Sequence, residues 1–170
     1  MGETERLTFL KKTYPHAKEV ERETGFNAVA LSAQAAAESG WGESAPGNMY
    51  FGVKAHSHPR RQLIRTKEYH NTPDKKYPVI HSITKSGDMY LYDVEDWFRE
   101  YDSPRESFKD HADFLLSNPR YAEALKHSSN PKRFLSEIAR AGYATRKDYA
   151  DFMSSMVDSV ERRLKKLGFI

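Results

Sequence analysis

Three consecutive alanines, at positions 35–37, constrain the fold of this chain most strongly, because they lead directly into a helix stop. Glu38 follows them, and Gly40 then ends the helix, since only glycine enters the left-handed conformation without a Cβ penalty. Asn27 is a suitable N-cap, so the sequence predicts a helix over residues 28–39. Its small side chains allow either another helix backbone or a sugar to approach closely.

Glu38 is the candidate for chemistry in this stretch, because Trp41 follows just after the helix stop. A carboxyl group beside a large aromatic ring is poorly solvated, and desolvation favours its protonated form. A carboxylic acid that stays protonated near neutral pH can protonate a leaving-group oxygen. The competing interpretation is a surface glutamate at a helix end, next to a tryptophan that belongs to the core.

Composition narrows the class of protein. The chain has 170 residues, enough for one domain with a substantial core, and its 30% charged residues are typical of a water-soluble protein. No apolar run approaches the roughly 20 residues that span a bilayer. The chain has no cysteine, which excludes disulfides, thiol catalysis and cysteine-ligated metal. The net charge of +3 favours an anionic partner but is too small to argue for nucleic acid.

Helical patterns occupy both ends of the chain. Residues 3–24 have helical spacing, and Pro15 is expected to break or restart that helix because it lacks an N–H donor. A Ser-x-x-Glu capping box opens a helix at Ser103 that runs to about residue 117. Further helices are expected after Asn118-Pro119, after Asn130-Pro131 and over residues 147–167.

The middle of the chain has strand character instead. Residues 64–70 alternate in polarity, and residues 79–84 and 89–94 read as further strands separated by a turn at 85–88. These strands predict a small antiparallel sheet between two helical halves. The expected fold is therefore α+β and mainly helical, a single domain over residues 1–170. Its helical parts would be 1–58 and 101–170, and its β-lobe about 60–100 would overhang a cleft.

The glutamate stretch also resembles a known family. Ala33 to Ser44 reads Ala-Gln-Ala-Ala-Ala-Glu-Ser-Gly-Trp-Gly-Glu-Ser, and Asn48 to Lys54 reads Asn-Met-Tyr-Phe-Gly-Val-Lys. These segments resemble the catalytic segment of glycoside hydrolase family 73, bacterial N-acetylglucosaminidases that include the peptidoglycan-hydrolase domain of the flagellar rod protein. The resemblance runs from about Asn27 to Asp158. It implies a lysozyme-like fold with the β-lobe over the active-site cleft, and Glu38 as the general acid.

A second carboxylate is implied in the β-lobe. Residues 65–71 resemble the family's Thr-Thr-Glu-Tyr-Glu-Asn-Gly segment, whose glutamate is the proposed second catalytic carboxylate, and this implies that Glu68 is the base toward water. Thr72 replaces the family's glycine, and an added bend follows it at residues 73–76. The alternative for Glu68 is an exposed strand glutamate.

The C-terminal part carries a tyrosine of the family pattern. Residues 141–145, Ala-Gly-Tyr-Ala-Thr, resemble the segment whose tyrosine lines the cleft near the acid, which implies an orienting or electrostatic role for Tyr143. The family's following aspartate is Arg146 here. The alternative for Tyr143 is a half-buried core aromatic.

Substrate contacts are expected from polar and aromatic side chains. Those expected to bind the glycan are Trp41, Asn48, Tyr50, Phe51 and Tyr69. The alternative for Phe51 is that it fills the core. A metal site at the His56-x-His58 pair is not expected, because no carboxylate pattern lies nearby, and no cofactor is expected.

The resulting hypothesis is a peptidoglycan hydrolase that cuts the β-1,4 bond between N-acetylglucosamine and N-acetylmuramic acid. In one variant of the mechanism the substrate's own N-acetyl oxygen attacks, which leaves Glu68 a supporting role. A lytic transglycosylase, which needs only one catalytic acid, is the nearest rival. A non-catalytic wall-binding or assembly module is the rival from another class.

The expected site of action is the bacterial periplasm or cell wall, and the expected partner is the glycan strand. The first residues lack the basic-then-apolar layout of a secretory signal, so we expect delivery by another route or removal of a leader. These features suit a phage lysin, or a toxin delivered into rival bacteria that has a cognate immunity protein. Neither nucleic acid nor a membrane span is expected.

Overall fold

The computed structural model describes residues 1–143 and 147–170 and divides them into two compact units. Met1–Phe51 and Tyr101–Ile170 form a helical unit, and Gly52–Glu100 form a sheet unit. The chain thus leaves the helical unit once, builds the sheet unit as an insertion and returns. Among the described residues, no helix has both the length and the apolar character to cross a membrane.

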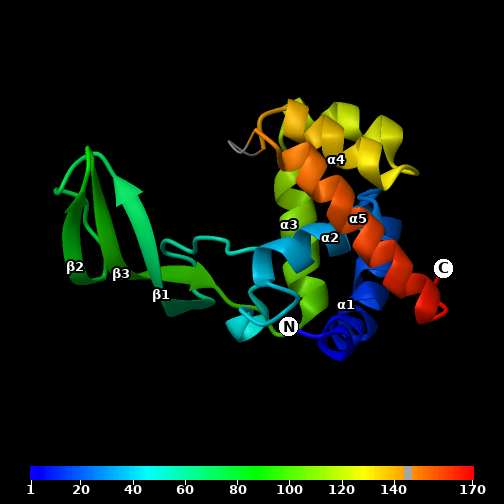
Figure 1. Cartoon of the computed structure of the whole chain (residues 1–170), viewed down its shortest axis with the longest axis horizontal. Coiled ribbons are helices and arrows are strands. Elements are labelled where there is room, and N and C mark those ends of the chain that lie inside the picture. The colour runs from blue at the N-terminus through cyan, green and yellow to red at the C-terminus, as the bar shows by residue number, and fades with distance from the viewer. Residues whose placement is uncertain (144–146) are drawn as a thin grey trace. The chain divides into compact units, whose positions relative to one another are not determined.

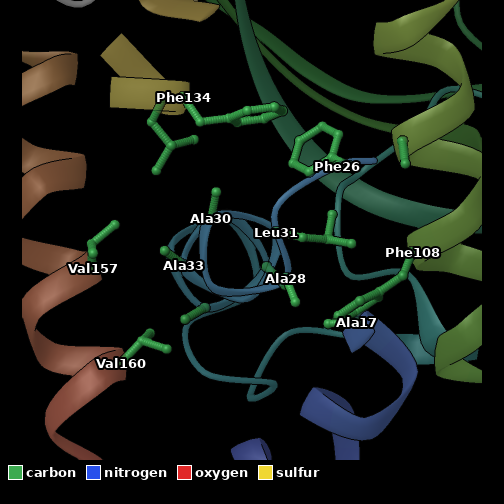
Figure 2. Packing of buried hydrophobic residues seen from close by; sticks show 14 of the residues in the cluster. Ala17, Phe26, Ala28, Ala30, Leu31, Ala33, Phe108, Phe134, Val157 and Val160 are labelled. Carbon is green, nitrogen blue, oxygen red and sulfur yellow. The ribbon is translucent and has the colours of Figure 1, made fainter. Parts of the chain in front are cut away.

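The helical unit is built around one short helix, α2 (Ala28–Ser39) (Figure 1). Around α2 lie α1 (Glu3–Thr24), α4 (Pro131–Arg140) and α5 (Tyr149–Lys166), while α3 (Pro104–Leu116) packs on α1. Figure 2 looks along α2 and shows side chains of the other helices pointing toward it from several sides. These side chains include Ala17, Phe108, Phe134, Val157 and Val160.

The alanines of α2 explain this arrangement. Ala30, Ala33, Ala35 and Ala36 are all at most 1% exposed, so neighbouring helices cover them. Small side chains let those helices approach closely, and interiors packed at crystal-like density leave no gap there. For these four positions, helix packing rather than contact with a sugar is the role of the small residues.

Both ends of α2 follow the sequence prediction. The Oδ1 atom of Asn27 accepts a hydrogen bond from the Ala30 N–H at 2.9 Å, and the Asn27 amide donates to the Ser128 carbonyl at 2.7 Å. Gly40 adopts the left-handed conformation at φ 59°, and Trp41 adopts it as well at φ 58°. The chain therefore turns sharply just after Glu38, which leaves this residue in the last helical turn.

The expectation that Pro15 breaks the first helix is wrong, because α1 continues through it from Glu3 to Thr24. Proline removes one backbone hydrogen bond inside a helix. Tyr14 and Ala17 on either side are buried in the core, so tertiary packing holds the helix across the missing bond.

Helices α3 and α4 in the C-terminal half begin at the N-cap residues that the sequence predicts. The Ser103 hydroxyl accepts from the Glu106 N–H at 3.3 Å at the start of α3, and the Asn130 side chain caps α4 in the same way. The segment after Asn118 is a 3₁₀ helix, η2 (Pro119–His127), rather than an α-helix. A further short 3₁₀ turn, η1 (Pro46–Asn48), lies in the loop after α2.

The sheet unit contains the predicted antiparallel strands. Its strands β1 (Arg61–His70), β2 (Val79–Ser86) and β3 (Met89–Arg99) form a sheet in the order β1-β3-β2. Gly87, at φ 62°, and Asp88 make the tight turn between β2 and β3. Burial alternates strictly along β1, so Glu68 lies on the more buried face and Tyr69 on the opposite, exposed face.

Candidate active site

Glu38 occupies the last turn of α2, where its side chain remains open to solvent. Surrounding protein atoms nevertheless desolvate the carboxyl group and raise its pKa above the ordinary value. Among the described residues, no cation contributes to this shift, since desolvation is its only cause. Solvent access together with a raised pKa is the combination that a proton donor to a bound substrate requires.

Two tyrosines interact electrostatically with Glu38. Burial raises the pKa of Tyr143 far above its ordinary value, and the nearby Tyr149 and Glu38 raise it further. Burial also raises the pKa of Tyr149 to about 12, which the hydrogen bond from Gln34 opposes and the charge of Glu38 reinforces. The two rings lie 5.6 Å apart between centroids. Both hydroxyls therefore stay protonated at physiological pH and can donate hydrogen bonds.

A buried hydrogen-bond chain lies beneath this group. His111 Nε2 donates to the Oε1 atom of Gln34 at 2.9 Å, and the Gln34 amide donates to the Tyr149 hydroxyl at 3.0 Å. Gln34 lies one helical turn before Glu38 on α2. Because Tyr149 accepts from Gln34, its own proton is free to point elsewhere. These two hydrogen bonds thus link α2, the helix that carries Glu38, to α3 and to the start of α5.

His111 is the buried end of that chain. It is 4% exposed, and burial lowers its pKa to about 3, so it is neutral at physiological pH. The ring of Phe51 stacks on it in parallel at 3.9 Å, and the Tyr143 ring meets it edge-on at 6.3 Å. His111 therefore ties α3, the loop after α2 and Tyr143 together.

Sequence reasoning did not assign a role to Gln34, His111 or Tyr149. A weak signal for Gln34 was its spacing of one turn from Glu38. A weak signal for His111 was a titratable residue within the apolar stripe of Phe108, Ala112 and Leu115. Their contacts join residues 77 and 115 positions apart, a distance over which local patterns carry no information.

Trp41, expected to bind glycan and to desolvate Glu38, has other partners. The guanidinium groups of Arg6 and Arg163 lie 5.3 Å and 5.2 Å from its ring centroid, and Phe9 packs edge-on at 5.8 Å. The ring also lines a shallow hollow of about 250 Å³ beside α1, shared with Tyr50. Its contacts therefore lie toward α1 and α5, while the aromatic rings that interact electrostatically with Glu38 are those of Tyr143 and Tyr149.

The loop residues expected to bind glycan differ in their surroundings. Asn48 is half-buried, and its amide donates to the Tyr101 carbonyl at 3.0 Å. Tyr50 is 3% exposed and packs against Phe9 and Phe108. Phe51 packs on Phe108 and His111. Tyr50 and Phe51 thus attach the loop to the core, and Phe51 is the one in contact with the buried chain beneath Glu38.

Glu68 belongs to the sheet unit and has charged and polar neighbours. Its Oε1 atom accepts a short hydrogen bond from the Lys54 ammonium, which also donates to Asp96 at 2.8 Å. Desolvation opposes the charge on Lys54, but the hydrogen bonds to Asp96 and Glu68 outweigh it and raise the pKa of Lys54. Burial raises the pKa of Tyr77, and the nearby charge of Glu68 adds to this effect.

The remaining expectations for the sheet unit concern Tyr69, the added bend and the histidine pair. Tyr69 is 60% exposed on the face opposite Glu68. The bend after Thr72 is tied to the sheet, because the Tyr92 hydroxyl donates to the Thr72 carbonyl and accepts from the Lys75 N–H. His58 accepts from the Arg60 N–H. Within residues 1–143 and 147–170, no group of three or more metal-ligating side chains could hold an ion.

The segment around Tyr143 is described in part. Tyr143 is half-buried, and its ring lies 6.4 Å from that of Tyr121. Residues 144–146, which include the expected Ala-Thr of the family pattern and the departure at Arg146, lie outside the described residues.

Comparison with known proteins identifies the fold and the family. The family model for glucosaminidase, described as mannosyl-glycoprotein endo-beta-N-acetylglucosaminidase, matches residues 14–162. The chain belongs to the glucosaminidase family. The peptidoglycan hydrolase FlgJ of Vibrio cholerae is 38% identical over 154 residues, which cover 86% of this chain and 41% of FlgJ. The chain thus spans less than half the length of that relative.

Solved structures agree with this family. The glycoside hydrolase domain of FlgJ from Salmonella typhimurium superposes with a TM-score of 0.69 at 28% identity, covering 96% of this chain and 92% of that domain. A type VI secretion system effector–immunity complex from Pseudomonas protegens contains a chain with the same fold, at a TM-score of 0.57, 17% identity and 96% coverage of both chains. The resemblance to glycoside hydrolase family 73, the mixed helical fold with its small sheet and the glycoside hydrolase class are thereby confirmed.

Proposed function

We propose that this chain is an N-acetylglucosaminidase that hydrolyses the β-1,4 bond between N-acetylglucosamine and N-acetylmuramic acid in peptidoglycan. One observation carries the proposal: Glu38 is open to solvent at the end of α2, its carboxyl group is desolvated, and it interacts electrostatically with two protonated tyrosines. Peptidoglycan as the substrate follows the peptidoglycan hydrolases among the relatives.

In the proposed reaction, Glu38 donates its proton to the glycosidic oxygen as the bond to the anomeric carbon breaks. The transition state then carries positive charge on the sugar ring, and the Glu38 carboxylate is left negative. The hydroxyls of Tyr143 and Tyr149, which stay protonated, donate hydrogen bonds that favour that developing negative charge. Water completes the reaction at the anomeric carbon.

Glu68 is proposed as the second carboxylate, the base that activates this water. Its Oε1 atom already accepts a hydrogen bond from the Lys54 ammonium, which occupies one of the two oxygens that could contact a water. This observation favours a second candidate, a reaction that needs Glu38 alone. In the lytic transglycosylase version, the other β-1,4 bond breaks: the 6-hydroxyl of a muramic acid attacks the anomeric carbon of the same sugar, and Glu38 protonates the oxygen of the departing N-acetylglucosamine. In the substrate-assisted version, the N-acetyl oxygen attacks.

Product analysis tests the proposal. Purified peptidoglycan is digested with the protein, the products are reduced with borohydride, and the new chain ends are identified by mass spectrometry. A reduced N-acetylglucosamine end is expected. An anhydro-muramic end would replace the hydrolase with a transglycosylase, and the absence of any product combined with binding to the wall would indicate a non-catalytic module.

Peptidoglycan as substrate implies that the protein acts in the cell wall or periplasm. A toxin role with a cognate immunity protein remains part of the proposal, and the similar fold in an effector–immunity complex is compatible with it. Expression of the protein with a periplasmic leader tests this role. Lysis is expected, and harmless accumulation of active enzyme in the periplasm would exclude a toxin.

A further inference from the structure

A hollow of about 360 Å³ opens between η2 and α4, outside the groups assigned to the reaction. Three arginines and two glutamates line it. The lining residues are Arg120, Glu123, Arg133, Glu137, Arg140 and Ala141. We call this feature the arginine hollow.

The carboxylates in the arginine hollow are already neutralised. Glu137 is 5% exposed, and its Oε1 atom lies 2.9 Å from Arg133 Nε and 3.4 Å from Arg140 Nη1. Glu123 pairs with Lys126 at 3.0 Å, a cation outside the lining. A guanidinium carries five N–H donors, and one Glu137 oxygen pairs with two of the three lining arginines. The lining therefore keeps an excess of positive charge.

Arg120 is the lining residue best placed to meet an anion. Its guanidinium lies 4.9 Å over the ring of Tyr121, and its Nη2 atom donates to the Tyr121 hydroxyl at 2.8 Å. This hydroxyl is the partner that the structure gives Arg120, a neutral one, so the charge on Arg120 is not offset by a carboxylate in the described residues. A guanidinium held in place by stacking loses little entropy when it binds a carboxylate.

Arg120 of the arginine hollow lies close to the segment that carries Tyr143. A Cβ atom built on Gly142 would stand 3.8 Å from Arg120 Nη1, and Tyr143 is the next residue. On the other side of Arg120, the Tyr121 ring lies 6.4 Å from the Tyr143 ring. Arg120 is thus connected to Tyr143 through the Tyr121 ring, and Tyr143 in turn interacts electrostatically with Glu38.

We propose that the arginine hollow binds a carboxylate of the peptide stem on a muramic acid close to the cleaved bond. This inference rests on the proposed function, because stem carboxylates reach the hollow only on a peptidoglycan strand that the protein binds. A strand stripped of its stems keeps only the lactyl carboxylate of each muramic acid. The planar fork of arginine matches a carboxylate with two parallel hydrogen bonds. The hollow would make the enzyme select strands that still carry their stems over stripped strands.

The test compares two substrates and three proteins. Soluble glycan strands are prepared with intact stems, or stripped of stems by an amidase, and kcat/KM is measured on both for the wild type, Arg120→Gln and Arg162→Gln. Arg162 is an exposed arginine on α5, so its variant removes the same charge away from the hollow. We expect the wild type to prefer stem-bearing strands about 10-fold or more, from the ~1.5–3 kcal/mol of a hydrogen bond to a charged group.

Arg120→Gln should reduce that preference about 10-fold, and Arg162→Gln should retain it. Arg120→Lys, which keeps the charge but loses the fork, should fall between wild type and Arg120→Gln. An equal preference in the wild type and Arg120→Gln would overturn the proposal. A wild type without any preference would overturn it as well.

A binding measurement separates this inference from the proposed function. The soluble stem tetrapeptide is titrated into Glu38→Gln and into the Glu38→Gln, Arg120→Gln double variant, and amide NMR shifts are followed. Binding lost in the double variant supports the hollow even if neither glycan is cleaved. Inorganic phosphate is titrated in parallel. Tighter binding of phosphate than of tetrapeptide at Arg120 would overturn the assignment of a stem carboxylate.

Discussion

The two carboxylates of the proposed reaction lie in contrasting surroundings. Glu38 ends a helix of the helical unit, where desolvation raises its pKa and its electrostatic neighbours are tyrosines. Glu68 lies in a strand of the sheet unit and is paired with the ammonium of Lys54. The first setting favours a neutral carboxylic acid and the second places a cation against a carboxylate. The same residue type is thus prepared for donating a proton in one unit and for bearing charge in the other.

The largest effect is expected from Glu38→Gln, which keeps the size of the side chain but removes the proton donor. We expect kcat to fall about 10³-fold, within the range for loss of a general acid. Release of reducing ends from purified peptidoglycan measures this change. Glu43→Gln, an exposed glutamate of the same stretch, is the matched control and should keep wild-type activity. Retention of more than a tenth of the rate by Glu38→Gln would remove Glu38 from the acid role.

Glu68→Gln tests the other half of the comparison. As the base toward water, Glu68 should contribute about 10²-fold to kcat, so the variant should lose about that much. Asp96→Asn serves as the control, because Asp96 also binds Lys54 but is not the proposed base. A loss below 10-fold that equals the loss in Asp96→Asn would show that both carboxylates merely hold Lys54, and would favour a reaction with Glu38 alone.

The hydrogen bonds from His111 through Gln34 to Tyr149 predict a smaller effect. Breaking them should lower both the stability of the protein and its reaction rate. Gln34→Leu leaves His111 and Tyr149 without their buried partner, which should lower the free energy of unfolding by about 2–4 kcal/mol. We expect kcat to fall about 10-fold with little change in KM, because the Tyr149 hydroxyl loses its fixed orientation. Urea unfolding and steady-state kinetics measure the two effects.

Ser32→Ala is the control for Gln34→Leu. Ser32 is a fully buried polar residue of the same helix, and its hydroxyl has no hydrogen-bond partner among the residues that the structure describes. This variant should match the wild type in rate. If Gln34→Leu lowers stability alone and leaves kcat intact, the buried hydrogen bonds of Gln34 support the fold but do not orient the Tyr149 hydroxyl for the reaction.

The smallest effect is the pH dependence of stability at Glu38. A carboxyl group whose pKa is raised in the folded state stabilises the fold below the ordinary value of 4.5, and this contribution is lost as the pH rises through the raised pKa. Glu38→Gln removes that loss. The melting temperature of the variant should therefore rise relative to that of the wild type as the pH increases from about 4 to 8. A constant difference between the two proteins across that range would show that Glu38 is not desolvated.

Much of the local structure followed from the sequence. The Asn27 cap, the Gly40 stop and the alternation along β1 depend on the backbone preferences of a few consecutive residues, and the structure shows all of them. Glu38 could be singled out because its helix end and its family pattern lie within one short stretch. The path of α1 through Pro15 could not be predicted in this way, since core packing around Tyr14 and Ala17 outweighs a local preference.

What the tertiary structure decided is which side chains meet. Sequence proximity predicted Trp41 as the aromatic neighbour of Glu38. The structure adds that the indole contacts Arg6 and Arg163, and that Tyr143 and Tyr149 interact electrostatically with Glu38. The chain from His111 to Tyr149 and the ion pair of Glu68 with Lys54 join residues from separate elements. Local sequence sets the backbone conformation of each element, whereas the pKa values of the site depend on burial and charge that only the packed fold supplies.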